Sequence, residues 1–264
     1  NPGGANARFE TVANNIPGGG PVPEPYFIHT QGIYYKSRIG AGYAQVVGEN
    51  VYSSIYDAGE GWASGDIGKN VTLSETLINL RPSATPGAPD AIYRINAAGY
   101  NGLNPRSYRV KINGDSILGQ EMNFFDYTKV TKSIPLALIS SGTAVIEVTN
   151  QSLVPGADRM IVAQMELVYP RQFNFDNLTN YTFNLPANLA GNYLEITNFT
   201  YAGITPALYD LTNGKRYLAD LSAAPVLKFA LQPSATARKL VLVSENPSHI
   251  YNVTSIQQRN FVNY

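Results

Sequence analysis

The residues best suited to chemistry in this sequence lie in one short stretch, residues 56–62, which reads YDAGEGW. It combines two aromatic side chains, two carboxylates and two glycines that allow the backbone to turn. Exposed aromatic rings can stack on sugars, and loop carboxylates can bind Ca²⁺, which requires only oxygen ligands at suitable spacing. The candidate ligand contacts are therefore Tyr56, Asp57, Glu60 and Trp62. A structural calcium ion held by the two carboxylates is the one cofactor considered.

A structural role explains the same residues without any ligand. Trp62 is the only tryptophan of the chain, and a tryptophan at the edge of a β-sandwich commonly seals its core. Two carboxylates in one turn rarely face a cleft together, as a glycosidase pair must. We therefore expect Trp62 to be buried in a core, and solvent exposure of this ring would favour sugar stacking instead.

The composition excludes several classes of enzyme. The chain has no cysteine, and therefore no thiolate nucleophile, no disulfide and no cysteine-based zinc site. Its two histidines, His29 and His249, lie near opposite ends of the sequence without a neighbouring carboxylate, so we expect surface or rim positions for both. The stretch GWASG has its serine one position too late for a nucleophile elbow. We predict that this chain is not an enzyme and has no catalytic residue and no assigned metal ligand.

The charge balance argues against two kinds of partner. Lys and Arg number 19, as do Asp and Glu, so the formal net charge is zero and no basic field attracts nucleic acid. No stretch of about 18 consecutive apolar residues is present, so no membrane span is predicted.

Alternating apolar and polar residues run through the chain and predict an all-β fold. Short runs rich in Tyr, Phe, Val and Thr are separated by Gly, Pro and Asn, as strands are separated by turns. Residues 159–171, RMIVAQMELVYPR, are expected to form a long central strand. Asn113-Gly114 and Asn213-Gly214 are expected to form type I′ hairpin turns, because Asn and Gly tolerate positive φ.

The pattern divides the chain into three parts. Residues 1–25 are dense in Gly, Pro and Asn and predict an extended arm or loop. Residues 26–170 predict a jelly-roll-like β-sandwich, and residues 171–264, with shorter strands, predict a smaller immunoglobulin-like β-sandwich. Since the sequence starts at Asn1 and stops directly after an aromatic run, we expect it to be a piece of a larger protein.

Two stretches of the C-terminal third, YPRQFNF and LYDLTNGKRY, resemble the region just upstream of the peptidase domain in the PorU family. These proteins are gingipain-like cysteine peptidases that act as sortases of the type IX secretion system in Bacteroidetes. YSSIYDAGEGW and KSIPLALISSGTAVIEVTN resemble the β domain that comes before this region. The resemblance covers most of the chain and implies two non-catalytic β domains of such a protein.

The resemblance also implies a function and a location. Members of the family cleave a C-terminal sorting domain from secreted proteins and link them to an anionic lipopolysaccharide, with a Cys and a His of the peptidase domain. The implied role of this chain is to scaffold or dock the downstream peptidase domain, its secreted protein substrates or other secretion components. The implied location is the bacterial cell surface and outer membrane, after transit through the periplasm.

The alternative, from the residues themselves, is a carbohydrate-binding module for surface polysaccharide. In that interpretation Trp62 and exposed tyrosines stack on the sugar rings.

Overall fold

The computed structural model describes residues 9–16, 22–38, 43–46, 50–53, 61–101, 105–123, 126–152, 158–251, 253, 255 and 257, with backbone only for 43–46, 50–53, 100 and 101. These residues form β-strands and two short 3₁₀ helices, Leu136–Ile139 and Pro247–His249. Neither helix has the length and apolar character needed to span a membrane. The predicted all-β fold is confirmed.

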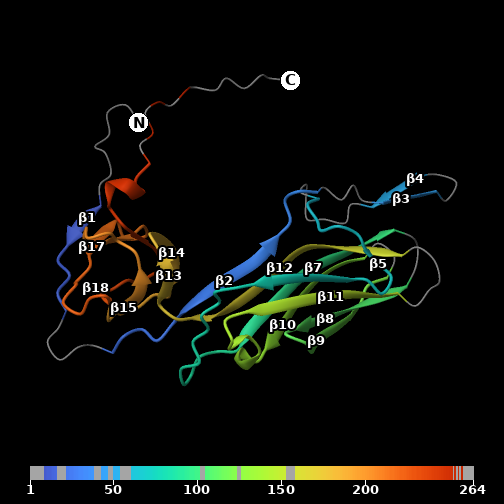
Figure 1. Ribbon diagram of the computed structural model, residues 1–264, viewed down its shortest axis with the longest axis horizontal. Helices are drawn as coiled ribbons and strands as arrows, with labels where there is room; N and C mark the ends of the chain where they lie inside the picture. Colours follow the sequence, from blue (N-terminus) through green and yellow to red (C-terminus); the bar gives the residue numbers. More distant parts are fainter. Residues whose placement is uncertain are drawn as a thin grey trace. The chain divides into compact units, whose positions relative to one another are not determined.

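The chain divides into two compact units (Figure 1). Residues 25–172 form one, which we call the inserted unit. Residues 1–24 together with 173–264 form the other, which we call the outer unit. The chain therefore starts in the outer unit, passes through the whole inserted unit and then returns to complete the outer one.

Two antiparallel sheets make up the inserted unit. One has the strand order β10-β7-β12-β2, with the short β5 also paired to β12, and the other has the order β6-β11-β8-β9. Along the chain, each strand lies in the opposite sheet to the strand before it, except that β2 and β5 share one sheet and β8 and β9 form a hairpin in the other. This alternation gives the double Greek-key connection of a jelly roll. The strand bounds are β2 (Phe27–Tyr34), β5 (Ile67–Gly68), β6 (Thr72–Leu77), β7 (Ala91–Asn101), β8 (Arg106–Ile112), β9 (Asp115–Glu121), β10 (Tyr127–Ile134), β11 (Ala144–Ser152) and β12 (Arg159–Arg171), with a separate β3–β4 hairpin (Tyr43–Val46, Asn50–Ser53).

The core of the inserted unit follows from the two-residue period of its strands. Every second residue of β8 and of β11 is buried, because successive strand side chains face opposite sides of a sheet. The inner faces of both sheets join in one apolar cluster, which includes Tyr93, Val110, Ile146 and Leu167. The predicted central strand is β12, which lies between β7 and β2.

A buried ion pair lies at one end of this core. Arg106 Nε donates to both carboxylate oxygens of Asp158 at 3.0 Å, and Nη2 donates to Oδ1 at 2.7 Å. Both side chains are 0% exposed. Asn150 Nδ2 donates to Asp158 Oδ2 at 2.9 Å and to the carbonyl oxygen of Ile67 at 3.0 Å. The network therefore joins β5, β8 and β11 to the start of β12.

The outer unit is a smaller two-sheet sandwich. One sheet has the order β1-β17-β16-β19-β14 and the other has the order β13-β15-β18. The strand bounds are β1 (Glu10–Val12), β13 (Asn174–Leu178), β14 (Asn180–Leu185), β15 (Asn192–Phe199), β16 (Ala207–Asp210), β17 (Lys215–Leu218), β18 (Leu227–Leu231) and β19 (Arg238–Val243).

The strands of the outer unit are connected in the same order as those of the jelly roll in the inserted unit, except that no described strand corresponds to β12. The order β14-β19-β16-β17 corresponds to β6-β11-β8-β9, and β13 and β15 correspond to β2 and β7. Because no strand separates them, β13 and β15 are direct neighbours and run parallel. The unit is thus immunoglobulin-like in its two-sheet architecture, but its strand order differs from the ABED and CFG sheets of immunoglobulin domains.

The N-terminal segment differs from the predicted arm, because part of it belongs to the outer unit. β1 pairs in parallel with β17. Just after β1, Asn14 Nδ2 donates to the carbonyl oxygens of Leu218 at 2.9 Å and Lys228 at 2.8 Å, and Asn14 Oδ1 accepts from the N–H of Ala230 at 2.7 Å. This single side chain bridges the chain at β17 and β18, which belong to different sheets.

Replacing Asn14 with alanine is expected to lower the free energy of unfolding of the outer unit by about 1 to 3 kcal/mol, because three hydrogen bonds are lost together. Amide hydrogen exchange of the β18 backbone measures this loss at the site. Asn15→Ala is the matched control, since no hydrogen bond of the Asn15 side chain is among those described. Equal exchange rates in the two variants would contradict the prediction.

One of the two predicted type I′ turns is confirmed and the other is a different turn. Asn113 and Gly114 have φ of 50° and 89° and connect β8 directly to β9. The β16–β17 hairpin has a four-residue loop, 211–214, in which Gly214 alone has positive φ, at 65°. Asp210 Oδ1 accepts the N–H groups of two loop residues at 3.1 and 3.0 Å. These bonds stabilise the longer loop.

Candidate functional site

Trp62 is the one predicted ligand contact within the described residues, and Tyr56, Asp57 and Glu60 lie outside them. Its side chain is 37% exposed, whereas the next residue, Ala63, is 1% exposed. The expectation that Trp62 is buried in a core is therefore wrong.

Ala63 is buried instead of Trp62, because the segment that contains both residues crosses the outer face of the sheet that includes β7 and β12. Ala63 packs against Ala98 of β7 and Ile161 of β12. Each of these two residues is next in sequence to a residue of the main core, so its side chain points away from that core. A methyl group fits closely against this face, and the larger ring of Trp62 is left at the surface.

The carboxylate of Asp66, four residues after Trp62, binds two arginines. Asp66 Oδ1 lies 2.7 Å from Arg38 Nη1, and Asp66 Oδ2 lies 2.9 Å from Arg159 Nη1. Ser64 Oγ accepts the N–H of Val162 at 3.0 Å. These contacts tie the segment to β12, so they have a structural explanation.

No group of three or more His, Cys, Asp or Glu side chains within the described residues could hold a metal ion. The two histidines lie in different units. His29 is half-buried between the rings of Phe27 and Tyr169, with centroids 5.8 Å from each in edge-to-face geometry. Burial, and secondarily the positive charge of Arg171, lowers the pKa of His29 to about 4. This imidazole is therefore neutral near pH 7 and packs as an aromatic ring.

Titratable side chains gather beside a pocket of about 510 Å³ in the outer unit. Tyr209 donates to Glu245 Oε1 at 2.5 Å, and Arg216 Nη2 lies 2.5 Å from Glu245 Oε2. The hydrogen bond from Arg216 lowers the pKa of Glu245, whereas burial and the bond to this carboxylate raise the pKa of Tyr209. Glu245 therefore stays ionised and paired, which suits a structural contact better than proton transfer.

A serine and a histidine meet in the same pocket. His249 Nδ1 lies 2.9 Å from Ser244 Oγ, which is the spacing of a nucleophile and its base. Ser244 is 4% exposed, however, and its hydroxyl lies 3.3 Å from the carbonyl oxygen of Tyr201, to which it donates. The buried and engaged hydroxyl is poorly placed to attack a substrate.

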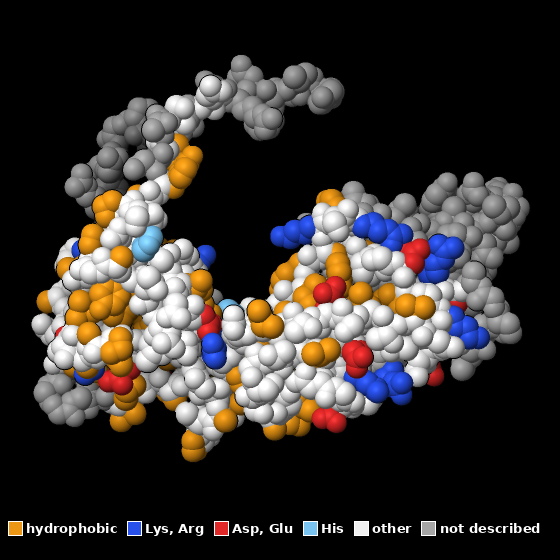
Figure 2. Space-filling view, viewed as in Figure 1, with side chains coloured by type: hydrophobic (Ala, Val, Ile, Leu, Met, Phe, Trp, Pro, Cys, Tyr) orange, Lys and Arg blue, Asp and Glu red, His pale blue; other side chains and the backbone are white. Residues whose placement is uncertain are grey.

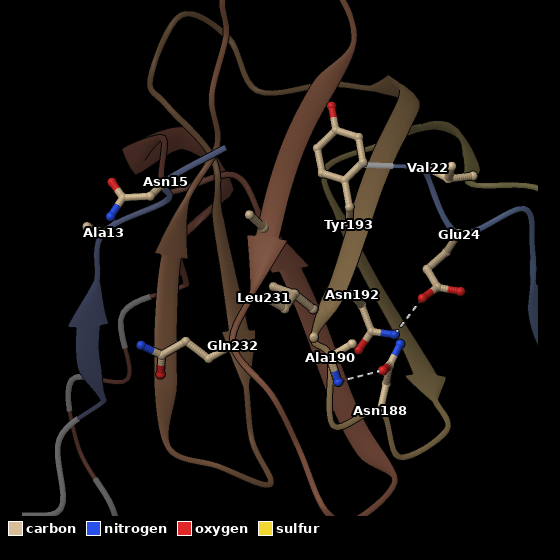
Figure 3. A pocket seen from close by; sticks show the side chains of 12 residues that line it. Ala13, Asn15, Val22, Glu24, Asn188, Ala190, Asn192, Tyr193, Leu231 and Gln232 are labelled. Atoms are coloured by element: carbon tan, nitrogen blue, oxygen red, sulfur yellow. Dashed lines mark hydrogen bonds between the residues drawn. The ribbon is translucent and has the colours of Figure 1, made fainter. Parts of the chain in front are cut away.

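A second pocket, of about 480 Å³, lies between the N-terminal segment and the ends of β15 and β18 (Figure 3). Asn192 and Glu24 point toward each other there, and Asn192 Nδ2 donates to Glu24 Oε1 at 2.7 Å. Asn192 Oδ1 is buried without a hydrogen-bond partner. Gly191 has φ of 85°, and a Cβ at this position would lie 2.4 Å from the carbonyl oxygen of Leu231. The pocket thus presents amide and carboxylate groups, and no Ser, Cys or His side chain lines it.

Charges of both signs are scattered in small groups over the face of the molecule drawn in Figure 2. Hydrophobic side chains on that face are likewise divided into separate patches. This distribution agrees with the zero net charge of the sequence. Among the side chains that are coloured on this face, Lys and Arg form no broad positive area.

The strand β2 is an open edge of the inserted unit. It is the last strand of its sheet, and among the described strands it pairs with β12 alone (Figure 1). The N–H of Ser83 donates to the carbonyl oxygen of Pro170 at 2.9 Å, so this carbonyl points away from β2. Pro170 is the partner of Ile28. The N–H and C=O of Ile28 therefore point away from β12, toward the free edge.

The direction of the backbone groups alternates along an antiparallel ladder, so every second residue of β2 repeats this arrangement. The free edge carries the N–H and C=O groups of Ile28, Thr30, Gly32 and Tyr34. No hydrogen bond to any of these eight groups occurs within the described residues. Within the described part of the chain, this edge of β2 is therefore unpaired.

No family model matches the sequence, and no curated protein matches it. Among solved structures, dimeric latent PorU from Porphyromonas gingivalis is similar with a TM-score of 0.56 and 11% identity, over 84% of this chain and 20% of that chain. The CBM36-1 domain of a multidomain xylanase from the hindgut metagenome of Trinervitermes trinervoides is similar over 53% of this chain and 96% of that chain, with 14% identity and a TM-score of 0.32.

The first similarity shows a shared β fold. It covers more of this chain than either unit contains, so both units take part in it. This chain spans one fifth of the length of that PorU chain. The second similarity has too low a TM-score to carry an argument.

Proposed function

We propose that this chain is a non-catalytic docking module of a larger cell-surface protein with a gingipain-like cysteine peptidase domain. In this role it holds the peptidase domain, or the secreted proteins on which that domain acts, in a defined position. The observation that carries the proposal is the fold shared with PorU across both units. Since the similarity takes up one fifth of that longer chain, the chemistry would belong to the remainder.

The side chains of this chain support a docking role. The buried Asp158 is bound to Arg106, and the carboxylate of Glu245 is bound to Arg216 and Tyr209. These reactive groups are thus engaged in contacts within their own sandwich, Asp158 in the inserted unit and Glu245 in the outer unit. Rigid sandwiches present loops and strand edges, which are the elements that dock extended peptides and neighbouring domains.

Isothermal titration tests the docking role. The 264-residue chain is titrated with the separately produced peptidase domain of the parent protein, and then with proteins that carry the sorting domain. We expect saturable binding to one of them with a dissociation constant on the order of 1 μM or below. Absence of binding to both would contradict the proposal, as would peptide hydrolysis by this chain alone that a point mutation abolishes.

The second candidate, a carbohydrate-binding module, is favoured by the exposure of Trp62. Trp62 is the only tryptophan, so emission excited at its absorption edge reports on this position alone. If the chain is a docking module, surface polysaccharide will leave the emission unchanged. A saturable blue shift on adding polysaccharide, together with loss of polysaccharide binding in Trp62→Ala, would instead establish sugar binding.

A further inference from the structure

The pocket beside β15 and β18 in the outer unit contains a hydrogen-bond acceptor that the protein itself does not use (Figure 3). Asn192 is 4% exposed, and its Oδ1 has no hydrogen-bond partner among the described residues. A buried acceptor without a donor is costly, and the great majority of such atoms in proteins are bonded. Since Asn192 lines the pocket, a ligand that enters the pocket can supply the missing donor.

The pocket also carries a negative charge that is not neutralised. Glu24 is the one charged side chain among the described residues that line it. Glu24 Oε1 accepts a hydrogen bond from Asn192 Nδ2, whereas no hydrogen bond or ion pair of Oε2 occurs within the described residues. The two free acceptors, Asn192 Oδ1 and Glu24 Oε2, therefore favour a ligand group that is positively charged and only donates hydrogen bonds.

An ammonium group fits these acceptors better than a guanidinium or a metal ion. A guanidinium binds a carboxylate through parallel bonds to both oxygens, and Glu24 Oε1 is already bonded to Asn192. An ammonium is a compact charge whose donors turn toward separate acceptors. A metal ion needs more ligands, and no group of three or more His, Cys, Asp or Glu side chains within the described residues could hold one.

Apolar side chains at the edge of the pocket favour an ammonium that belongs to a protein chain. Val22 lines the pocket and is 90% exposed. Leu189 lies in the sequence between the lining residues Asn188 and Ala190 and is 76% exposed. Such side chains can cover the methylene stem of a lysine and the residues beside it in a peptide, which a small free amine does not have.

We propose that this pocket binds the side chain of a lysine from a partner protein, with Nζ paired to the carboxylate of Glu24 and donating to Asn192 Oδ1. The inference rests on the proposed docking role for the source of that lysine. The binding of a lysine side chain is nevertheless a property of the pocket itself, so it is measured without the partner.

A titration followed by NMR tests the site. The isotope-labelled 264-residue chain is mixed with a tripeptide, capped at both ends, that has a lysine between two leucines. The backbone amide of Gly191 and the side-chain amide of Asn192 are the reporters, because both residues line the pocket. We expect saturable shifts of both signals with a dissociation constant on the order of 1 mM or below. The same peptide with Nε-acetyl-lysine or with arginine is expected to bind about 10-fold more weakly or worse.

Variants identify the groups that bind the ammonium. Glu24→Gln removes the charge but keeps an oxygen that can accept from Asn192 Nδ2, and it is expected to raise the dissociation constant about 10-fold or more. Glu195→Gln is the matched control, because the carboxylate of Glu195 accepts from Tyr193 and does not line the pocket. Asn192→Leu removes the free acceptor and keeps a side chain of similar shape, so it is expected to fold and to lose binding.

Equal dissociation constants for the lysine and acetyl-lysine peptides, or for the wild type and Glu24→Gln, would refute the lysine site. Equal or tighter binding of the arginine peptide would refute the choice of an ammonium. Saturable shifts of Gly191 and Asn192 with neutral sugars, and none with the lysine peptide, would assign the pocket to hydroxyl ligands instead. Intact binding of the lysine peptide, in a chain that binds neither the peptidase domain nor the sorting-domain proteins, would support the site and refute the docking role alone.

Discussion

Replacing Asp158 with alanine will lower the free energy of unfolding of the inserted unit by about 3 to 5 kcal/mol. The substitution leaves the guanidinium of Arg106, which is 0% exposed, without its carboxylate. The loss is a large share of the whole stability of a small domain, which is about 5 to 15 kcal/mol. Urea denaturation followed by the fluorescence of Trp62 measures it, because the only tryptophan of the chain lies in the inserted unit.

Two further variants separate the buried pair from a general effect of lost charge. Asp66→Ala removes a carboxylate from the partly exposed pairs with Arg38 and Arg159, and is expected to cost about 1 kcal/mol or less. Replacing Arg106 and Asp158 together with Met and Leu removes both buried charges and is expected to recover most of the loss. Equal destabilisation by Asp158→Ala and Asp66→Ala would show that the buried network does not have the importance assigned to it.

Acidification will destabilise the inserted unit through His29. Its pKa is about 4 in the folded protein and about 6.5 in an unfolded chain. Between these values the unfolded chain binds a proton at His29 and the folded state does not, so the free energy of unfolding falls as the pH falls from 6.5 to 4. Each pKa unit corresponds to about 1.4 kcal/mol, and partial contact with solvent reduces the total to about 2 kcal/mol.

The His29 contribution is measured as a difference between two proteins. Urea midpoints followed by Trp62 fluorescence are recorded from pH 7.5 to pH 4 for the wild type and for His29→Phe, which keeps the ring packing with Phe27 and Tyr169. The variant is expected to lose less stability over this range. His249→Phe, in the outer unit, should follow the wild type. Parallel pH profiles for the wild type and His29→Phe would refute a role for His29.

Local sequence patterns are sufficient for much of the fold. From Met165 to Tyr169 the alternation in RMIVAQMELVYPR reports which residues face the core, whereas the register shift between Val162 and Gln164 interrupts it earlier in β12. Asn113-Gly114 specifies its turn because positive φ at both positions is a property of the two residues themselves. In each case the residues that carry the sequence pattern are the same residues that form the strand or the turn.

Features that depend on contacts between residues far apart in the sequence cannot be predicted from local sequence patterns. The period of two says which face of a strand is buried but not which strand lies beside it, so the parallel pairing of β1 with β17 has no signal in residues 1–25. The bridge made by Asn14 rests on hydrogen bonds to residues more than 200 positions away. Trp62 was expected in a core because of its size, whereas the segment brings Ala63 to the sheet instead. The open edge of β2 follows from strand order, which composition does not encode.

The insertion of one unit into the sequence of the other has a consequence for synthesis. The inserted unit is complete once residue 172 has left the ribosome, and its first and last strands pair directly, from Phe27 with Arg171 onward. The strand β1 is made before the inserted unit, but its partner β17 is translated only after that unit. The jelly roll can therefore fold while the outer unit is still incomplete, and β1 pairs with β17 only after the strands of the jelly roll have been made.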